Sequence, residues 1–448
     1  MGMLVRSCID FIHVHRKQLS LWASIALFVA TIIRYPVRFD PNDSLRRGFG
    51  EPTSLAHALI EKGAFANPFA ALDTGPSAHL SPVFPAFMAL LMKVFGSGSA
   101  GAYALKWATT LILALQLALY PRFSRILGMG EMNGIIGASV WIVARPVLSI
   151  GWEAFYAALL VAVVCCCYRL YLASQPERSC RMAWLLGSLA GFLIFVLPTM
   201  ALVYAAWLAL EMWRQKGALW NRSLLPLILL PILMNAPWTI RNALVFHRFV
   251  FIRDNLGLEL SASNNDCAQF GVTADIESGC FDKSHPNHNV VEARKVLEMG
   301  EANYNDSRLH EALRWIGSHP ARFTKLTMMR FLAFWFPTEA FTIHYTSGRR
   351  LERYVIYLMT LLSVPGLIVL YRRDFRSAVI LVSCLAIFPL TYYLVQFEYR
   401  FRYPILWVAF LLGAVPITAS ASFLSRLLTA RDKSGSETES TSGQLVAE

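Results

Sequence analysis

The sequence has few charged residues for its length. Only 16% of its 448 residues are Asp, Glu, Lys or Arg, against about 25% in a soluble globular domain. Among its 8 cysteines no CxxC or Cys/His spacing of a zinc site occurs. It also shows no convincing internal repeat, which weakens a transporter interpretation. These deficits argue against a soluble enzyme and a zinc module, whereas the 56% of hydrophobic residues indicates a membrane protein.

The hydrophobic residues gather in long runs that approach the length of a bilayer span, about 20 mostly apolar residues. The net charge is +12, but the basic residues lie mainly between these runs. Membrane topology therefore explains the charge better than nucleic acid does. The first run follows Arg16 and Lys17 and ends at Arg34-Tyr-Pro36, with no small-residue cleavage site. We interpret it as an uncleaved first span.

Short basic loops set the expected orientation, because Lys and Arg favour the cytoplasmic side. Loops 121–131, 173–181, 214–222 and 371–376 are basic. The resulting alternation predicts an all-α polytopic domain over 1–423, with both termini cytoplasmic and a disordered cytoplasmic tail over 424–448. It contains ten spans: 19–37, 100–120, 132–150, 152–172, 182–197, 199–213, 224–240, 353–371, 377–395 and 403–423.

Two further apolar segments do not fit this alternation as spans. Segment 82–96 is short and proline-rich, and segment 326–341 carries Arg330 near its middle. A central arginine costs about 2.5–3.5 kcal/mol on insertion scales, so we expect both segments to lie on the outer membrane surface. A first outer loop, 38–98, and a small, mostly helical second outer region, 241–325, complete the predicted outer face.

The first outer loop holds the leading catalytic candidate, Glu51. An amphipathic helical pattern over 52–62 follows it, so its carboxylate is explained by the helix dipole alone. Alternatively, a carboxylate at a partly dry membrane boundary has a raised pKa and serves as a general base for a hydroxyl group. Asp43 is a weaker candidate because Asn42-Asp43 is typical of a turn. His79 either binds substrate or is satisfied by the local backbone.

Ionisable residues at the ends of other spans are candidates for a substrate cavity. Arg145 closes one span and Glu153 opens the next, so they form either an ion pair or a polar lining. Arg241 closes another span on the outer side. The last outer turn contains Glu398, Arg400 and Arg402.

Positive charge is depleted from short outer turns, so the two arginines of the last outer turn run against the topology bias. They are either interfacial anchors or a clamp for a lipid phosphate, which guanidinium groups bind with two hydrogen bonds.

Taken in order, these segments resemble the GT-C superfamily of membrane glycosyltransferases, and within it the protein O-mannosyltransferases and lipid A aminoarabinose transferases. The matching pieces are Gly48-Phe-Gly-Glu51, Gly75-Pro…Leu80-Ser-Pro-Val-Phe-Pro85 with Lys93-Val-Phe-Gly96, Pro237-Trp-Thr-Ile-Arg241-Asn242, and Glu398-Tyr-Arg-Phe-Arg-Tyr-Pro404. The chain departs from the family where many members carry an adjacent Asp-Glu pair, because Gly50-Glu51-Pro52 supplies one carboxylate.

The resemblance implies a polyprenyl-phosphate sugar donor and transfer to a glycan, lipid or protein acceptor on the periplasmic face of a bacterial inner membrane. Glu51 would act as base or acceptor-orienting carboxylate, and Arg400 and Arg402 would stabilise the leaving phosphate. No cofactor is required, and a divalent metal stays open. A lipid or small-molecule transporter and a non-catalytic glycolipid-binding protein are the alternatives.

Cys267 and Cys280 share the polar second outer region. If this region faces an oxidising periplasm, the two cysteines are expected to form a disulfide. In a reducing compartment they stay free thiols.

Overall fold

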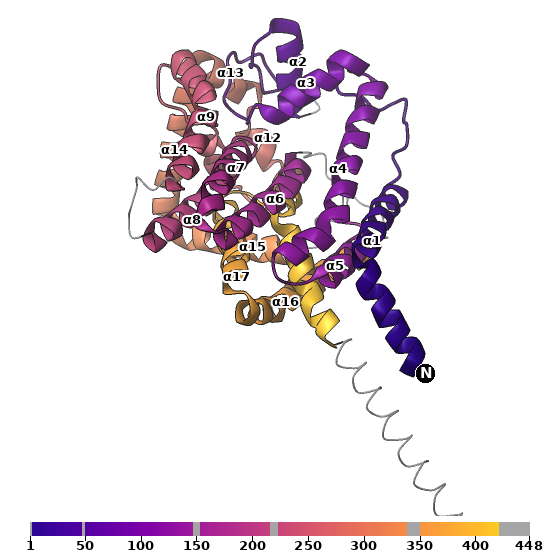
Figure 1. Ribbon diagram of the computed structural model, residues 1–448. Coiled ribbons are helices and arrows are strands. Elements are labelled where there is room, and N and C mark those ends of the chain that lie inside the picture. Colours follow the sequence, from indigo (N-terminus) through magenta and orange to yellow (C-terminus); the bar gives the residue numbers. More distant parts are fainter. Residues whose placement is uncertain (1, 47–49, 147–152, 216–222, 338–349, 421–448) are drawn as a thin grey trace, which may run out of the picture.

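The computed structural model describes residues 2–46, 50–146, 153–215, 223–337 and 350–420. This part of the chain is helical and contains no β-strand, only two isolated bridges, Ala66 with Pro76 and Gly271 with Phe397. One set of helices forms a large bundle (Figure 1): α1 (Gly2–Arg34), α4 (Ser99–Ile126), α5 (Glu131–Ala144), α6 (Glu153–Ala173), α7 (Pro176–Val196), α8 (Met200–Arg214), α9 (Leu224–Phe246), α16 (Arg350–Arg373), α17 (Phe375–Ile387), α18 (Leu390–Leu394) and η3 (Tyr399–Arg402), which continues as a helix to Ser420.

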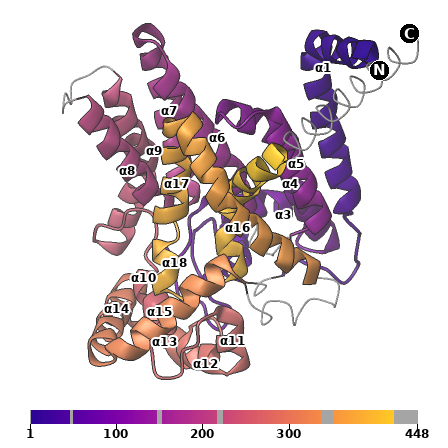
Figure 2. The same cartoon turned by 90° about the horizontal axis from the view of Figure 1, so that it is seen from below.

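A second set of helices lies in segments 51–95 and 256–335. They are α2 (Glu51–Lys62), α3 (Val83–Phe95), α10 (Leu256–Ser263), α11 (Val272–Glu277), α12 (Cys280–Ser284), α13 (Val290–Met299), α14 (Glu301–Ser318) and α15 (Pro320–Trp335). Helices α10 to α15 gather at one end of the molecule, and the N-terminus lies at the opposite end (Figure 2). The segment between α2 and α3 contacts this group, because Phe69 packs with Leu258 of α10, Val296 of α13 and Tyr304 of α14. The site described below lies where these two groups meet.

Seven helical stretches in the described residues are long and apolar enough to cross a bilayer, which confirms a multi-pass helical membrane protein. They match seven of the ten expected spans. The other three fall on the apolar part of α1, Gln18–Arg34, and on α5 and α8, which have 14 and 15 residues. At 1.5 Å per residue, 15 residues span about 22 Å of a hydrocarbon layer about 30 Å thick. The number ten is therefore not confirmed.

Small residues let the bundle helices approach one another closely. A Cβ atom on Gly366 of α16 would lie 2.0 Å from the Leu412 carbonyl oxygen, and one on Gly187 of α7 would lie 2.5 Å from that of Pro226 in α9. Such contacts are typical of membrane bundles, where packing rather than water exclusion holds helices together. The bundle core encloses three fully buried tryptophans, Trp141, Trp207 and Trp407.

Several helix predictions agree in position with the structure. Segment 52–62 falls in α2, segment 82–96 contains α3, and segment 326–341 overlaps α15, although 338–341 lie outside the described residues. In α15, Arg330 is buried, and its guanidinium group donates hydrogen bonds to Asn264 Oδ1 at 3.1 Å and to the Leu394 carbonyl at 3.0 Å. Its charge is therefore satisfied by protein oxygens, not by water above the membrane. The predicted tail, 424–448, lies outside the described residues.

Candidate functional site

Glu51 begins helix α2, at the point where the first outer loop turns back on itself. Gly50 has φ 101°, a conformation that L side chains rarely adopt, and Pro52 occupies the first helical turn. The Glu51 carboxylate lies between two histidines. Its Oε2 is 3.4 Å from His79 Nε2, and its Oε1 is 3.7 Å from His285 Nε2.

His79 is held by a rigid segment of the first outer loop, to which the second outer region is bound. Arg241 donates to the Ser77 carbonyl at 2.8 Å, and Arg253 donates to the His79 carbonyl at 3.0 Å. The Ala78 amide donates to Glu301 Oε1 at 2.6 Å. The His79 side chain is fully buried, and within the described residues its Nδ1 has no hydrogen-bond partner. Both arginines thus fix the backbone that presents the imidazole.

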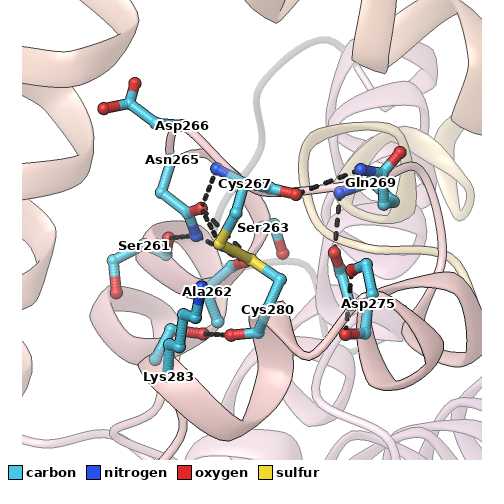
Figure 3. Close-up of a disulfide and its surroundings, with 12 residues drawn as sticks. Ser261, Ala262, Ser263, Asn265, Asp266, Cys267, Gln269, Asp275, Cys280 and Lys283 are labelled. Atoms are coloured by element: carbon cyan, nitrogen blue, oxygen red, sulfur yellow. Dashed lines mark hydrogen bonds between the residues drawn. A yellow bond between two sulfur atoms is a disulfide. The ribbon is translucent and has the colours of Figure 1, made fainter.

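His285 comes from the second outer region, directly after helix α12. Its ring stacks on Phe281 with centroids 4.4 Å apart, and its Nδ1 accepts a hydrogen bond from the Asn287 amide at 3.2 Å. Helix α12 begins at Cys280, which is joined to Cys267 by a disulfide (Figure 3). The disulfide therefore ties the segment that carries His285 to the end of α10.

The pKa of Glu51 is lower than its ordinary value, whereas the sequence analysis expected a raised one. Desolvation raises the pKa of this carboxyl group, but the neighbouring His79, His285 and Arg400 outweigh it and lower the pKa to about 2. The expectation of a raised pKa is therefore wrong, because the histidines and the arginine that surround the carboxylate could not be placed from the sequence. Desolvation lowers the pKa of His79, but Glu51, Glu301 and Glu259 raise it overall.

The second histidine has the opposite character. Desolvation lowers the pKa of His285 to about 4, although Glu51 favours its charged form. At neutral pH the site therefore contains an ionised carboxylate at Glu51 and a neutral imidazole at His285, next to His79, whose pKa is raised. The ionised Glu51 carboxylate can accept a hydrogen bond from a hydroxyl and stabilise positive charge on a neighbouring atom.

Three other acidic residues lie around His79. Burial raises the pKa of Glu301 to about 7 and that of Asp254 to about 6. Burial also raises the pKa of Glu259. No group of three or more His, Cys, Asp or Glu side chains in the described residues is arranged to hold a metal ion.

The last outer turn sends its two arginines to different places. Arg400 donates to Glu398 at 2.6 Å and is near enough to Glu51 to lower the pKa of that carboxyl group. Arg402 is buried, donates to the Trp335 carbonyl at 2.7 Å and to Thr360 Oγ1, and lies over the Trp335 ring. In a 3₁₀ helix of three residues per turn, residues two apart face different sides. The structure thus brings Arg400, and not Arg402, to Glu51.

The other predicted cavity residues have their own surroundings. Asp43 forms an ion pair with Lys106 of α4. Arg145 lies over the Tyr35 ring at 5.7 Å and lines a separate cavity. Arg241 fixes the first outer loop as described above. The side chain of Glu153 lies outside the described residues, so the Arg145–Glu153 alternative stays a prediction.

His285 and Glu301 were missed from the sequence. Each comes from the second outer region, and only the fold brings it to the first loop. The weak available signal was the short stretch Ser284-His-Pro-Asn-His288, which contains two histidines around a turn.

Comparison with known proteins identifies the fold. No family model and no curated protein matches the sequence. The archaeal oligosaccharyltransferase AglB from Archaeoglobus fulgidus, solved in complex with an inhibitory peptide and a dolichol-phosphate, is similar with a TM-score of 0.52 and 14% identity. The match covers 93% of this chain and 52% of that one, so this chain spans about half the length of AglB.

ArnT from Cupriavidus metallidurans, solved in the apo state, matches with a TM-score of 0.35 and 13% identity over 90% of this chain and 78% of that one. The first of these two matches shows a likeness of fold. The expected resemblance to GT-C membrane glycosyltransferases is confirmed at this level.

Proposed function

We propose that this protein is a glycosyltransferase that moves a sugar from a polyprenyl-phosphate donor to an acceptor on the non-cytoplasmic face of the membrane. The observation that carries the proposal is the position of the Glu51 carboxylate. It lies 3.4 Å from His79 and 3.7 Å from His285, near Arg400. The first outer loop contributes Glu51 and His79, the second outer region contributes His285, and the last outer turn contributes Arg400. The GT-C fold supports the same assignment.

The ionised Glu51 carboxylate orients the acceptor by accepting a hydrogen bond from its nucleophilic hydroxyl. The acceptor oxygen forms a bond to the anomeric carbon while the bond from that carbon to the phosphate oxygen breaks. The electron pair of the broken bond stays on the lipid phosphate. Because the O–H of the attacking acceptor oxygen becomes strongly acidic as the new bond forms, a carboxylate with a pKa of about 2 is basic enough to take its proton late in the step.

Positive charge develops on the sugar during such a transfer. The carboxylate stabilises this charge, and His79 keeps the carboxylate in place. Arg400 is the proposed partner of the leaving phosphate, because it is the arginine of the last outer turn that lies near Glu51. Arg402, which the sequence pairs with it, would then anchor the turn through Trp335 and Thr360.

The test compares Glu51→Gln with Glu61→Gln, a substitution at an exposed position of the same helix α2. Membranes that contain each variant are supplied with a panel of polyprenyl-phosphate sugars, and release of the polyprenyl phosphate is measured. We expect Glu51→Gln to lower turnover about 10²–10⁴-fold, the range for loss of a proton-transfer group, and Glu61→Gln to match the wild type.

Full turnover in Glu51→Gln would refute the assigned role of the carboxylate. Lipid binding without turnover of any donor would favour a non-catalytic glycolipid-binding protein instead. Flux across reconstituted vesicles without sugar transfer would favour a transporter.

A further inference from the structure

A cavity with three basic side chains in its lining lies at the end of helix α1, and none of its lining residues belongs to the Glu51 site. It has a volume of about 560 Å³, within the range of small-molecule sites. Its walls include Tyr35 and Arg38 from the segment after α1, Lys106 and Thr110 from α4, and Arg145 at the end of α5. In Figure 1 the segment after α1 runs beside α4 toward α2. The Asp43–Lys106 ion pair and the Phe39–Tyr103 ring contact hold it there.

The charge of this cavity selects an anion. Three cationic side chains line it, and one of them, Lys106, is paired with Asp43. Among the described residues, no carboxylate lies within ion-pair distance of Arg38 or Arg145. Both of these side chains belong to exposed residues. Three cationic side chains in the lining favour an anionic ligand over a neutral or cationic one.

The backbone at Arg145 is built in an unusual way. Helix α5 ends there with φ 54°, in the left-handed region, and the Arg145 amide still bonds to the Trp141 carbonyl at 2.8 Å. A left-handed residue is a common helix ending, although Gly or Asn occupies it more often than Arg. In this case the consequence is that the guanidinium group lies over Tyr35 and faces the cavity.

The depth of the cavity indicates a ligand that is partly lipid. Lys106 lies seven residues into α4, a candidate membrane span that begins at Ser99, and so about 10 Å along its axis. Because α4 has 28 residues and is about 42 Å long, it exceeds the hydrocarbon layer of about 30 Å, so Lys106 can lie at the level of the lipid head groups. Ile33 and Leu111, the sequence neighbours of the lining segments, expose 72% and 44% of their surface. In a bilayer these apolar side chains contact acyl or prenyl chains.

We propose that Arg38, Lys106 and Arg145 bind the phosphate head group of a lipid, whose hydrocarbon tail lies against the apolar faces of α1 and α4. Guanidinium groups bind phosphate oxygens with two parallel hydrogen bonds, and a lysine adds a point charge. The lipid is either the polyprenyl phosphate of the proposed transfer or an anionic phospholipid of the bilayer. The inference rests on the proposed function only for the first source, because binding itself needs no sugar transfer.

The test measures lipid binding by native mass spectrometry on the full-length protein in neutral phosphatidylcholine nanodiscs. A long-chain polyprenyl phosphate, phosphatidylglycerol and inorganic phosphate are titrated separately. The variants are Arg38→Gln alone, the triple Arg38→Gln, Lys106→Gln, Arg145→Gln, and Arg294→Gln as control, an exposed arginine of α13. We expect the triple variant to weaken lipid binding at least about 100-fold and Arg38→Gln about 10-fold, from the loss of charge-assisted hydrogen bonds. The control should bind as the wild type does.

Preference for polyprenyl phosphate would identify the lipid as donor or product. Equal binding of phosphatidylglycerol would identify it as a bilayer phospholipid. Either result supports the proposed site. Lipid binding that survives in both the single and the triple variant, binding of inorganic phosphate as tight as that of the lipids, or no lipid binding by the wild type would overturn it. The single variant keeps the test valid if the triple variant misfolds. Glu51→Gln should keep lipid binding while it loses transfer, so failure of the proposed function and failure of this site give different results.

Discussion

Glu301 is a buried carboxyl group whose protonation should control how firmly the His79 segment is held. Its side chain accepts the Ala78 amide at 2.6 Å, and burial raises its pKa from 4.5 to about 7. A group with a raised folded-state pKa contributes stability that is fully present below the unfolded value and lost as pH rises through the folded value. The window is therefore about pH 4.5 to 7. The difference between the two pKa values corresponds to about 3 kcal/mol.

The substitution Glu301→Gln removes this titration and keeps an oxygen that can accept the Ala78 amide. Hydrogen exchange of the peptide that contains Ala78, corrected for the intrinsic pH dependence of exchange, measures the local opening free energy. In the wild type, we expect protection to fall by about 100-fold between pH 5 and pH 8, because about 3 kcal/mol is lost. In Glu301→Gln this loss should be absent, so that the variant is more protected than the wild type at pH 8.

Other groups titrate in the same range, so the comparison between variant and wild type carries the result. The pKa of Asp254 is raised to about 6, so Asp254 also lowers the opening free energy as the pH rises. The pKa of His285 is lowered to about 4, so His285 raises the opening free energy as the pH rises. Both are present in the wild type and the variant, whereas the contribution of His79 becomes smaller in Glu301→Gln, because Glu301 is one of the groups that raise the pKa of His79. Glu298→Gln, at an exposed position of α13, is the matched control. If the wild type and Glu301→Gln lose protection equally with rising pH, the reasoning is wrong.

Two further predictions concern the elements that frame the site. The double substitution Cys267→Ser, Cys280→Ser opens a loop with a sequence separation of 13, which the chain-entropy model values at about 3 kcal/mol. Hydrogen exchange of residues 267–285 should accelerate while that of the α4 core is unchanged, and an unchanged rate in 267–285 would show that packing alone holds this segment. Arg402→Gln should lower thermal stability by about 1–3 kcal/mol, because buried partners lose their donor. Arg400→Gln should leave thermal stability near that of the wild type. It should shift the acidic limb of the transfer–pH profile to higher pH, because it removes a cation near the Glu51 carboxylate. Equal loss of stability in both variants would contradict the assignment of Arg402, and not Arg400, as the structural anchor.

The positions of most helices could be predicted from the sequence, because apolar length and helix-end signals are local. The amphipathic pattern over 52–62 falls in α2, and segment 82–96 contains α3. The number of spans was harder. Helix α5 stops at Arg145 after 14 residues because the backbone turns left-handed there, just before Pro146. Apolar composition alone does not report such an end.

The candidate site could be predicted only in part. Glu51 and His79 lie in one loop and were both found, whereas His285 lies far along the chain and reaches them only through the packing of the second outer region. The alternating aromatic and charged residues of the last outer turn also did not distinguish Arg400 from Arg402, because the sequence places both equally well for binding a phosphate. The two side chains point to different sides because they lie in a 3₁₀ turn, and the Trp335 carbonyl and Thr360 Oγ1 accept hydrogen bonds from Arg402.

The low pKa of Glu51 also bears on the missing second carboxylate of the first loop. Two adjacent carboxylates would repel each other, and one of them would hold a proton near neutral pH. Here a single carboxylate is flanked by His79 and His285 instead, and it stays ionised to a pH of about 2. A fixed negative charge suits the orientation of a hydroxyl and the stabilisation of a cationic sugar better than it suits early proton removal. The departure of the sequence from the Asp-Glu pattern is therefore compatible with activity, because the histidines supply what a second carboxylate could not.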